Sequence, residues 1–166
     1  MHLRSFVPAD AAPLTDLLHQ AYAELGASGL NFTAVDQDET TTLRRASGGV
    51  SWVLTEGDEL IATLTISLPA EAALRTLTPE ASEPHRAWLN QLAVRPAYRR
   101  RGLAESVRDV GYDWCRSQSA TSIGLDTAEP ATHLISLYAR WGFQTVDHVQ
   151  WPGKSYRSVV LTRSLL

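Results

Sequence analysis

The sequence contains one cysteine, Cys115, among its 166 residues. A lone cysteine excludes an intrachain disulfide and a cysteine-based zinc site, and we expect no metal cofactor. No base stands near Cys115 in the sequence, so we interpret it as a core or surface residue of a helix rather than a nucleophile. No apolar run is long enough to span a membrane. The N-terminus has no signal-peptide pattern, so a cytoplasmic location and no membrane partner are expected.

An excess of positive charge is also absent, because 15 Lys and Arg stand against 18 Asp and Glu, for a net charge of −3. This balance argues against a general nucleic-acid binder but permits a local basic patch. Hydrophobic residues make up 44% of the chain and charged residues 20%, as in ordinary globular proteins. The length suits one fold, so we predict a single domain over residues 1–166.

The stretch from Trp88 to Ala104 organises the chain. An apolar run of strand length, Trp88 to Val94, meets Pro96 and then a basic turn. A helix pattern follows, with Leu103 and Val107 among its periodic apolar residues. A strand therefore leads through a short loop directly into the first turn of a helix.

The loop before this helix has the chemistry of an anion site. The first N–H groups of a helix lack internal partners and lie at the positive end of the helix dipole. Gly102 allows the backbone to approach an anion closely, and Ala104 is also small. Arg99, Arg100 and Arg101 add charge that can pair with phosphate oxygens. The loop is thus a candidate phosphate-binding turn.

The remaining patterns indicate strands mixed with helices. Asp10 is a plausible N-cap for a first helix that Gly26 would end, and Asp36 with Glu39 resembles a capping box for a second helix. Two strand-like runs then flank Gly57-Asp58, which predicts a tight hairpin. In the second run the apolar residues alternate if Ile61 is set aside. We predict an α/β (α+β) sandwich around a mixed, largely antiparallel sheet of six to seven strands, flanked by about four helices.

Two ordered motifs carry a family resemblance. Arg99-x-x-Gly102-x-Ala104 after a strand resembles the acyl-CoA pyrophosphate loop of the GNAT superfamily of N-acyltransferases, and Leu137-Tyr138-x-x-x-Gly142-Phe143 resembles that family's downstream helix motif. The order of predicted elements is similar to the GNAT fold across nearly the whole chain. The resemblance implies an N-acetyltransferase that moves an acetyl group from acetyl-CoA to a primary amine, by direct attack through a tetrahedral intermediate.

The resemblance also assigns roles to residues. Tyr138 would donate a proton to the departing thiolate, and a backbone N–H near Leu92 or Ala93 would stabilise the oxyanion. The pantetheine would pair with the backbone of Leu92 and Val94. The predicted cofactor-binding residues are Leu92, Ala93, Val94, Arg99, Arg100, Arg101, Gly102, Leu103 and Ala104. Tyr22, Phe32 and Asp36 fall on the segment that in this family commonly shapes the acceptor side and are possible substrate contacts, but core and capping roles are the favoured interpretation for each.

One position departs from the family pattern and several questions stay open. Many members carry asparagine seven residues before the motif tyrosine, whereas this chain has Ala131; Thr132 or His133 would have to replace that contact. No motif identifies the base, which leaves Asp126, Asn90 through a water, His85 and His133. The acceptor amine, the acyl-chain preference and a homodimeric state are equally unassigned.

Two other classes of function compete with an enzyme. The first is an acyl-CoA sensor that has the fold but no turnover, which the presence of Tyr138 disfavours. The second is a nucleic-acid contact through Arg95, Arg99, Arg100 and Arg101. This second reading is weak because the cluster lacks interleaved aromatic residues and the chain is acidic.

Overall fold

The computed structural model describes all residues, 1–166, and contains one seven-stranded sheet. The strand order is β1-β2-β3-β4-β5-β7-β6, and every neighbouring pair is antiparallel except β4 and β5. The strands are β1 (His2–Ser5), β2 (Val50–Glu56), β3 (Glu59–Ser67), β4 (Arg86–Val94), β5 (Ser122–Ala128), β6 (Gln144–Val149) and β7 (Ser158–Ser164). The predicted mixed, largely antiparallel sheet is confirmed.

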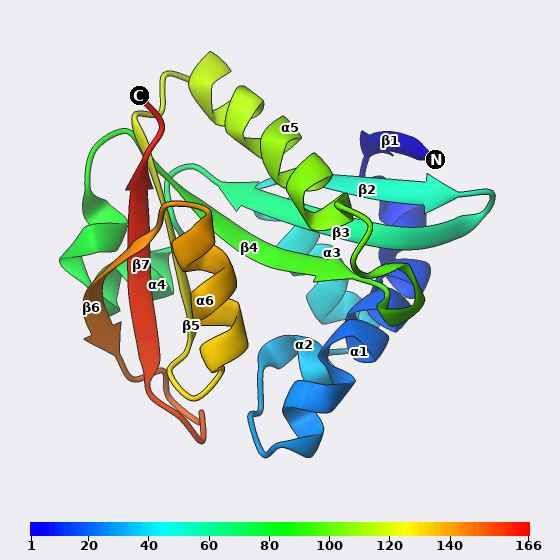
Figure 1. Cartoon of the computed structure of the whole chain (residues 1–166), viewed down its shortest axis with the longest axis horizontal. Helices are drawn as coiled ribbons and strands as arrows, with labels where there is room; N and C mark the ends of the chain where they lie inside the picture. Colours follow the sequence, from blue (N-terminus) through cyan, green and yellow to red (C-terminus); the bar gives the residue numbers. More distant parts are fainter.

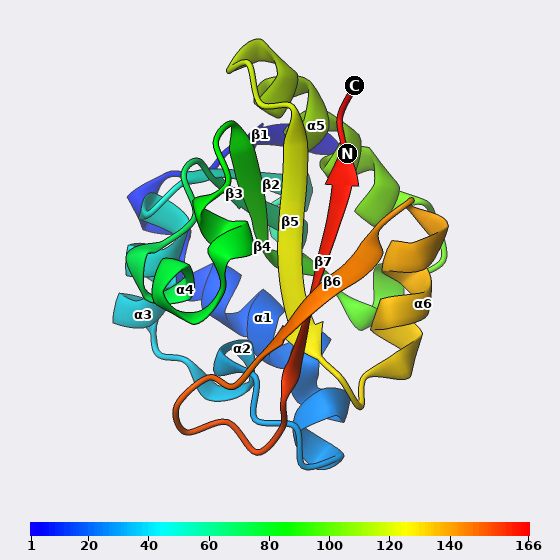
Figure 2. The same cartoon turned by 90° about the vertical axis from the view of Figure 1, so that its left-hand side faces the viewer.

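Six α-helices flank this sheet on both faces (Figures 1 and 2). They are α1 (Ala11–Ala27), α2 (Thr33–Asp36), α3 (Glu39–Ser47), α4 (Ala72–Leu77), α5 (Leu103–Ser117) and α6 (Thr132–Arg140). Helices α5 and α6 cover one face, and α1 to α4 lie on the other. No helix combines the length and the apolar character that a membrane crossing requires.

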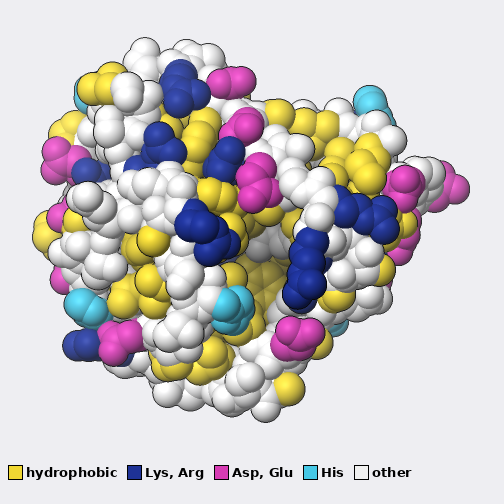
Figure 3. Space-filling model, viewed as in Figure 1, with side chains coloured by type: hydrophobic (Ala, Val, Ile, Leu, Met, Phe, Trp, Pro, Cys, Tyr) yellow, Lys and Arg dark blue, Asp and Glu magenta, His cyan; other side chains and the backbone are white.

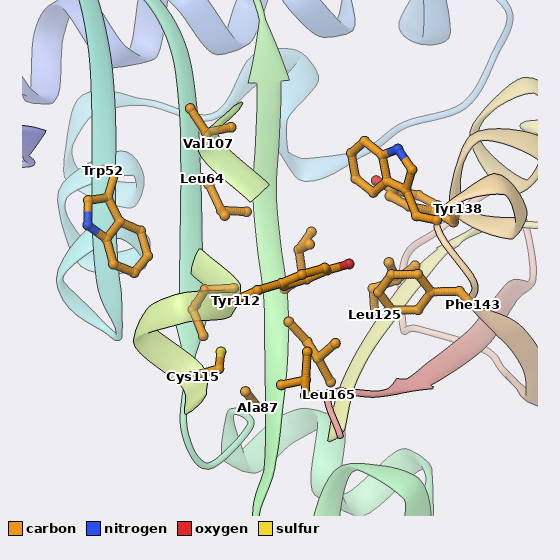
Figure 4. Close-up of a cluster of buried hydrophobic side chains, with 14 of the residues drawn as sticks. Trp52, Leu64, Ala87, Val107, Tyr112, Cys115, Leu125, Tyr138, Phe143 and Leu165 are labelled. Carbon is orange, nitrogen blue, oxygen red and sulfur yellow. The ribbon is translucent and has the colours of Figure 1, made fainter. Parts of the chain in front are cut away.

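Because helices cover both faces of the sheet, successive residues of the central strands are apolar, whichever face they point to. Trp52 and Leu54 pack into the large core cluster beneath α5, whereas Val53 between them packs with α1 and α3. Successive strand side chains point to opposite faces, so a strand buried on both sides needs no polar alternation. Cys115 is fully buried in the same large cluster, and burial raises the pKa of its thiol to about 11 (Figure 4).

The predicted hairpin around Gly57-Asp58 is confirmed, with Glu56 opposite Glu59. The register shifts between Leu54 and Thr55, because their partners on β3 are Ala62 and Leu60. Ile61 is therefore the extra residue of a β-bulge, which reverses the side-chain alternation at that point. The predicted alternation, which left out Ile61, missed this reversal. Leu60 packs in the core cluster that contains α1 residues, and Ala62 packs in the one that contains α5 residues.

Two predicted helix boundaries are wrong in the residue that forms them, and at a third Asp10 occupies the predicted N-cap position of α1 without a side-chain cap bond. Asp38, not Asp36, caps α3, since its Oδ1 accepts the N–H of Thr41 at 2.8 Å. The Asp10 carboxylate makes no cap bond to α1; it binds the Arg4 guanidinium and the Val7 N–H instead.

Gly26 does not end α1 but lies within its last turn, where an added Cβ would stand 2.6 Å from Cγ1 of Val35. The left-handed residue after this helix is Gly29, with φ of +86°. Gly26 thus makes room for a close packing partner, while Gly29 supplies the reversal that a helix end favours.

Candidate active site

The sheet divides where β4 and β5 separate. The two strands pair only from Arg86 to Trp88 on β4 and from Ser122 to Gly124 on β5. At the division, an added Cβ on Gly124 would lie 2.3 Å from Cζ3 of Trp88, so only glycine lets the strands meet there. Beyond it they diverge, and a cavity of about 580 Å³ opens between them. The surface is hollowed between the two halves of the sheet, with a hydrophobic floor bordered by Lys and Arg (Figure 3).

A second bulge turns the free edge of β4 towards this cavity. Gln91 has φ of +49°, and the register with β3 shifts opposite it, between Thr63 and Thr65. Ala93 and Thr63 lie opposite each other as a hydrogen-bonded pair of the antiparallel ladder. The same pattern recurs two residues further along, where the Arg95 N–H donates to Ile61 O. Because polar groups alternate along a strand, those of Leu92 and Val94 point away from β3, to the open side.

The two backbone N–H groups predicted as alternatives for stabilising the oxyanion therefore point in different directions. The N–H of Leu92 faces the open side, whereas the N–H of Ala93 is directed to β3. The Leu92 carbonyl already accepts the Tyr22 hydroxyl at 2.9 Å, which ties β4 to α1 across the cavity wall. Tyr22 and Phe32 line the cavity as expected for the acceptor side, but Asp36 is not among the lining residues.

The loop between β4 and α5 presents unpaired backbone donors. The six consecutive N–H groups from Arg100 to Glu105 donate no hydrogen bond within the chain; the series resumes with the Ser106 N–H on Gly102 O. Arg100 and Gly102 have φ of +63° and +74°, and such left-handed residues turn successive N–H groups to one side. Gly102 is favoured there by its positive φ, since an added Cβ would meet nothing within 4 Å. The loop is preorganised for an anion.

Most arginine side chains of this region have other partners. The Arg99 guanidinium donates to Ala21 O of α1 at 2.7 Å, and Arg101 lies over the Tyr98 ring at 5.1 Å. Arg95 is buried, binding Leu60 O and Asp16, which removes it from any surface cluster for nucleic acid. Leu103 packs into the core and Ala104 is half-buried against it. The free donors of this candidate anion site are therefore its backbone N–H groups and the Arg100 side chain, for which the structure shows no partner.

Tyr138 lies on α6 and lines the cavity, and its ring lies beside Phe143 (Figure 4). Its ring packs edge-on against Trp141 and Phe143, with centroids 5.7 and 5.9 Å away. Burial raises the pKa of its hydroxyl, so the group remains protonated, and no protein group hydrogen-bonds to it. Gly142 has φ of +88°, which confirms the expected left-handed turn after the helix. A protonated hydroxyl thus faces the cavity with its hydrogen free.

The four residues considered for the general base differ in whether they line the cavity. Asp126 and Asn90 line the cavity, whereas His85 and His133 are exposed and lie outside its lining. The Asp126 carboxylate accepts the indole N–H of Trp88 at 3.0 Å and of Trp151 at 2.8 Å. Burial raises its pKa above the ordinary aspartate value despite these bonds. A carboxylate with a raised pKa is a better proton acceptor near neutral pH.

Asn90 is engaged by its own neighbours. Its amide donates to Ser67 Oγ at 3.0 Å and to Trp88 O at 3.2 Å. Ala131, where the family often has asparagine, is buried at the start of α6. Thr132 beside it is exposed and lies outside the cavity lining.

The far wall of the cavity comes from segments that the sequence analysis did not connect. The loop from Gln150 to Arg157 closes over the turn after α1 through hydrogen bonds of 2.7 to 3.0 Å. These bonds are Asn31 Nδ2 to Gly153 O, Ser155 N to Asn31 Oδ1, Ser155 Oγ to Gly29 O, and Lys154 Nζ to Asn31 O and Thr33 Oγ1. This clamp places Trp151, Lys154 and Tyr156 in the cavity wall.

A buried polar network connects the β4 bulge to α3. Gln37 donates to Thr42 Oγ1 at 2.8 Å and to Gln91 Oε1 at 3.2 Å, and it accepts from Arg45 Nη1 at 2.7 Å. Arg45 thereby reaches the cavity from α3. Neither Arg45 nor Lys154 belongs to a motif, and no local pattern marks them, so sequence reasoning missed both.

The chain is similar to known proteins in sequence and in structure. A family model described as the acetyltransferase (GNAT) family matches residues 14–143. No curated protein matches the sequence. Among solved structures, the chain is similar to the ribosomal-protein-S18-alanine N-acetyltransferase from Escherichia coli, with a TM-score of 0.73 and 15% identity over 99% of this chain and 93% of that chain.

Two further structures show the same likeness. One is an acetyltransferase of the GNAT family from Staphylococcus aureus, with a TM-score of 0.71 and 15% identity over 99% of each chain. The other is an aminoglycoside 6'-N-acetyltransferase complexed with coenzyme A, with a TM-score of 0.71 and 13% identity over 100% of this chain and 98% of that chain. At these identities the similarity concerns the fold.

Proposed function

The chain belongs to the acetyltransferase (GNAT) family, and from this premise we propose that it transfers an acetyl group from acetyl-CoA to a primary amine held between β4 and β5. The observation that carries the proposal is the separation of these strands, which leaves the Leu92 and Val94 backbone without a strand partner beside a cavity that Tyr138 also lines. We further propose that residues 1–166 act as one domain, since β6 and β7 lie beyond the matched range but complete the sheet.

The cofactor side suits acetyl-CoA at two places. The pyrophosphate would accept hydrogen bonds from the free N–H groups between Arg100 and Glu105. The pantetheine amides would pair with Leu92 and Val94 as an added strand pairs with a sheet edge. Its partner at Leu92 O would replace the Tyr22 hydroxyl, which the structure places there.

The chemistry then needs two groups of this chain around the thioester. The neutral amine attacks the carbonyl carbon; a C–N bond forms and the C–S bond breaks. The Leu92 N–H would donate to the oxygen that gains charge. The departing sulfur leaves as a thiolate and takes the Tyr138 proton, and the proton released by the amine finally returns to Tyr138 through solvent, so the cycle closes with no net change in protons. Tyr138 suits this role because burial keeps it protonated and no protein group competes for its hydrogen.

The proton lost by the amine goes to Asp126 in our proposal. Asp126 is the cavity carboxylate whose raised pKa suits proton transfer, and the two indole bonds hold it in place. Two histidines that the sequence left open lie outside the cavity, and Asn90 is occupied with Ser67 and Trp88. Tyr138 and Asp126 both line the cavity, so the proposed proton donor and acceptor belong to one site.

The test is thiol release from acetyl-CoA, measured with wild-type protein and a panel of primary amines. We expect release that depends on both the amine and the enzyme. A matched Tyr138→Phe variant should retain acetyl-CoA binding and lose turnover. Acetyl-CoA binding with no release for any amine would instead favour the acyl-CoA sensor.

A further inference from the structure

Arg45 enters the cavity from α3 as a half-buried cation without a carboxylate partner. Its Nη1 donates to Gln37 Oε1, and no protein acceptor binds Nε or Nη2. Burial lowers its pKa, and Glu71 and Asp126 act on it only at longer range than an ion pair. Seven of the fourteen arginines form ion pairs within 4 Å, whereas Arg45 and the exposed Arg44 beside it line the cavity without one. A partly buried charge of this kind favours an anionic partner.

Lys154 supplies a second cation from the clamped loop on the opposite wall. Its ammonium donates to Asn31 O and Thr33 Oγ1, both uncharged acceptors. Burial lowers its pKa, and the repulsion of Arg45 lowers it further. Two positive charges from remote segments thus face one cavity and repel each other. An anion between them would relieve that repulsion and fill the free donors of both groups.

The lining of the same cavity is also partly aromatic. Phe32 packs against Tyr22 and Tyr156, with centroids 5.5 and 5.2 Å apart, and all three line the cavity. Such a wall suits the apolar body of a small molecule. Asp126, Arg45 and Tyr138 all line this cavity, so an acceptor bound to the cations would hold its amine in the same cavity as Asp126 and Tyr138.

From this arrangement we propose that the acceptor is a small primary amine carrying a carboxylate, an amino-acid-like molecule whose carboxylate binds Arg45 and Lys154. The proposal rests on the function proposed above, since it names the acceptor of the same site. The planar guanidinium edge of Arg45 matches a carboxylate in two-point contact. A doubly charged phosphate fits less well, because Glu71 and Asp126 line the same cavity and would repel it.

The test measures product binding, which does not require turnover. N-acetyl-alanine, N-acetyl-leucine, N-acetyl-phenylalanine and N-acetyl-glutamate are each titrated by calorimetry in the presence of saturating CoA, against the corresponding carboxamide. N-acetyl-phosphoethanolamine serves as the phosphate arm. We expect at least one carboxylate to bind at least about tenfold more tightly than its amide, as the loss of a charge-assisted hydrogen bond implies.

Three variants assign that preference to the proposed residues. Arg45→Gln and Lys154→Gln should each reduce the ratio of amide to carboxylate Kd towards one, and Arg45→Lys should restore part of it. Gln at position 154 can still donate to Asn31 O, so the clamp should survive and this variant tests the charge even if Arg45→Gln fails to fold. Arg75→Gln is the matched control, because Arg75 is exposed on α4 and outside the cavity lining.

Equal affinities within every pair, or a preference that neither substitution alters, would overturn the proposal, as would tighter binding of the phosphate compound. Thiol release from acetyl-CoA with the four free amino acids is measured in parallel. A carboxylate preference with no release would contradict acetyl transfer and leave the anion site standing. Thiol release without a carboxylate preference would support acetyl transfer and contradict the proposed carboxylate-binding site.

Discussion

The two sides of the cavity are built in different ways. The cofactor side uses backbone groups of one continuous stretch, the free N–H groups from Arg100 to Glu105 and the outer edge of β4. The acceptor side uses side chains from segments that are remote in sequence, including Arg45 on α3 and Lys154 in the clamped loop. A backbone site tolerates many side chains, so one side can stay constant while the other varies. In the proposed function, this difference separates the part that binds acetyl-CoA from the part that selects the amine.

The largest expected effect is a loss of stability when Trp141 is replaced, in the core cluster that also contains Tyr138. Trp141 is nearly buried, packs edge-on against Tyr138, and is covered by the Arg108 guanidinium 4.6 Å from its ring. Trp141→Ala should lower the free energy of unfolding by ~3–5 kcal/mol, since the cavity left in the core is large. Chemical denaturation measures this loss, with Leu166→Ala, at an exposed terminal residue, as the control. An unchanged unfolding midpoint would mean that α6 is not anchored as described.

The next effect separates chemistry from binding. Tyr138→Phe keeps the ring and removes the hydroxyl, so folding and acetyl-CoA affinity should be retained. We expect kcat to fall by about a hundredfold, the low end for a lost general acid, because a thiol with a pKa of about 8.5 is a fairly good leaving group. Rates at saturating acetyl-CoA measure it. Retention of more than half of kcat, with slow acceptors as well as fast ones, would assign Tyr138 to packing alone.

A smaller effect belongs to the cofactor side only. Gly102→Glu introduces a negative side chain at a left-handed residue beside the free N–H groups. We expect the Kd for acetyl-CoA to rise at least about tenfold, through repulsion of the pyrophosphate and strain at positive φ. Calorimetry measures this change. Affinity for an acceptor-side ligand should stay within about twofold, and an equal loss on both sides would contradict the division between them.

The fourth prediction concerns the pH profile of the acceptor side. Burial raises the pKa of Asp126, so this carboxyl takes up its proton at a higher pH than an ordinary aspartate. If it accepts the amine proton, kcat/KM should fall on the acid side with an inflection above the usual aspartate value near 3.9. Asp126→Asn should lower the rate and remove this inflection. Glu71→Gln, in the same cavity but outside the proposed proton path, should preserve it.

The same division explains how much the sequence could predict. The order of strands and helices, the Gly57-Asp58 turn and the family motifs depend on neighbouring residues, and the fold follows them. The loop at Gly102 was also accessible, because its glycine, arginines and helix start are contiguous. Ile61 and Gln91 were not, since a bulge depends on the partner strand as well as on the strand that contains it.

The acceptor wall could not be predicted for a related reason. Lys154 reaches the cavity only because Asn31 and Ser155 clamp two distant segments together. Arg45 is positioned by Gln37, which in turn binds the bulged Gln91. Each contact depends on tertiary structure, and none leaves a periodic or motif signal. The Arg99 guanidinium donates to Ala21 O, a tertiary contact that the sequence did not indicate, and its role at the cofactor stays a prediction.

The most direct test of this account is an acetyl-CoA titration followed by backbone amide chemical shifts of ¹⁵N-labelled protein. The account predicts the largest changes at the N–H groups from Arg100 to Glu105 and at Leu92 and Val94, with smaller changes at Arg45 and Lys154. Binding that leaves the loop amides unmoved, and instead shifts residues on the acceptor wall or outside the cavity, would contradict a cofactor site made of backbone groups.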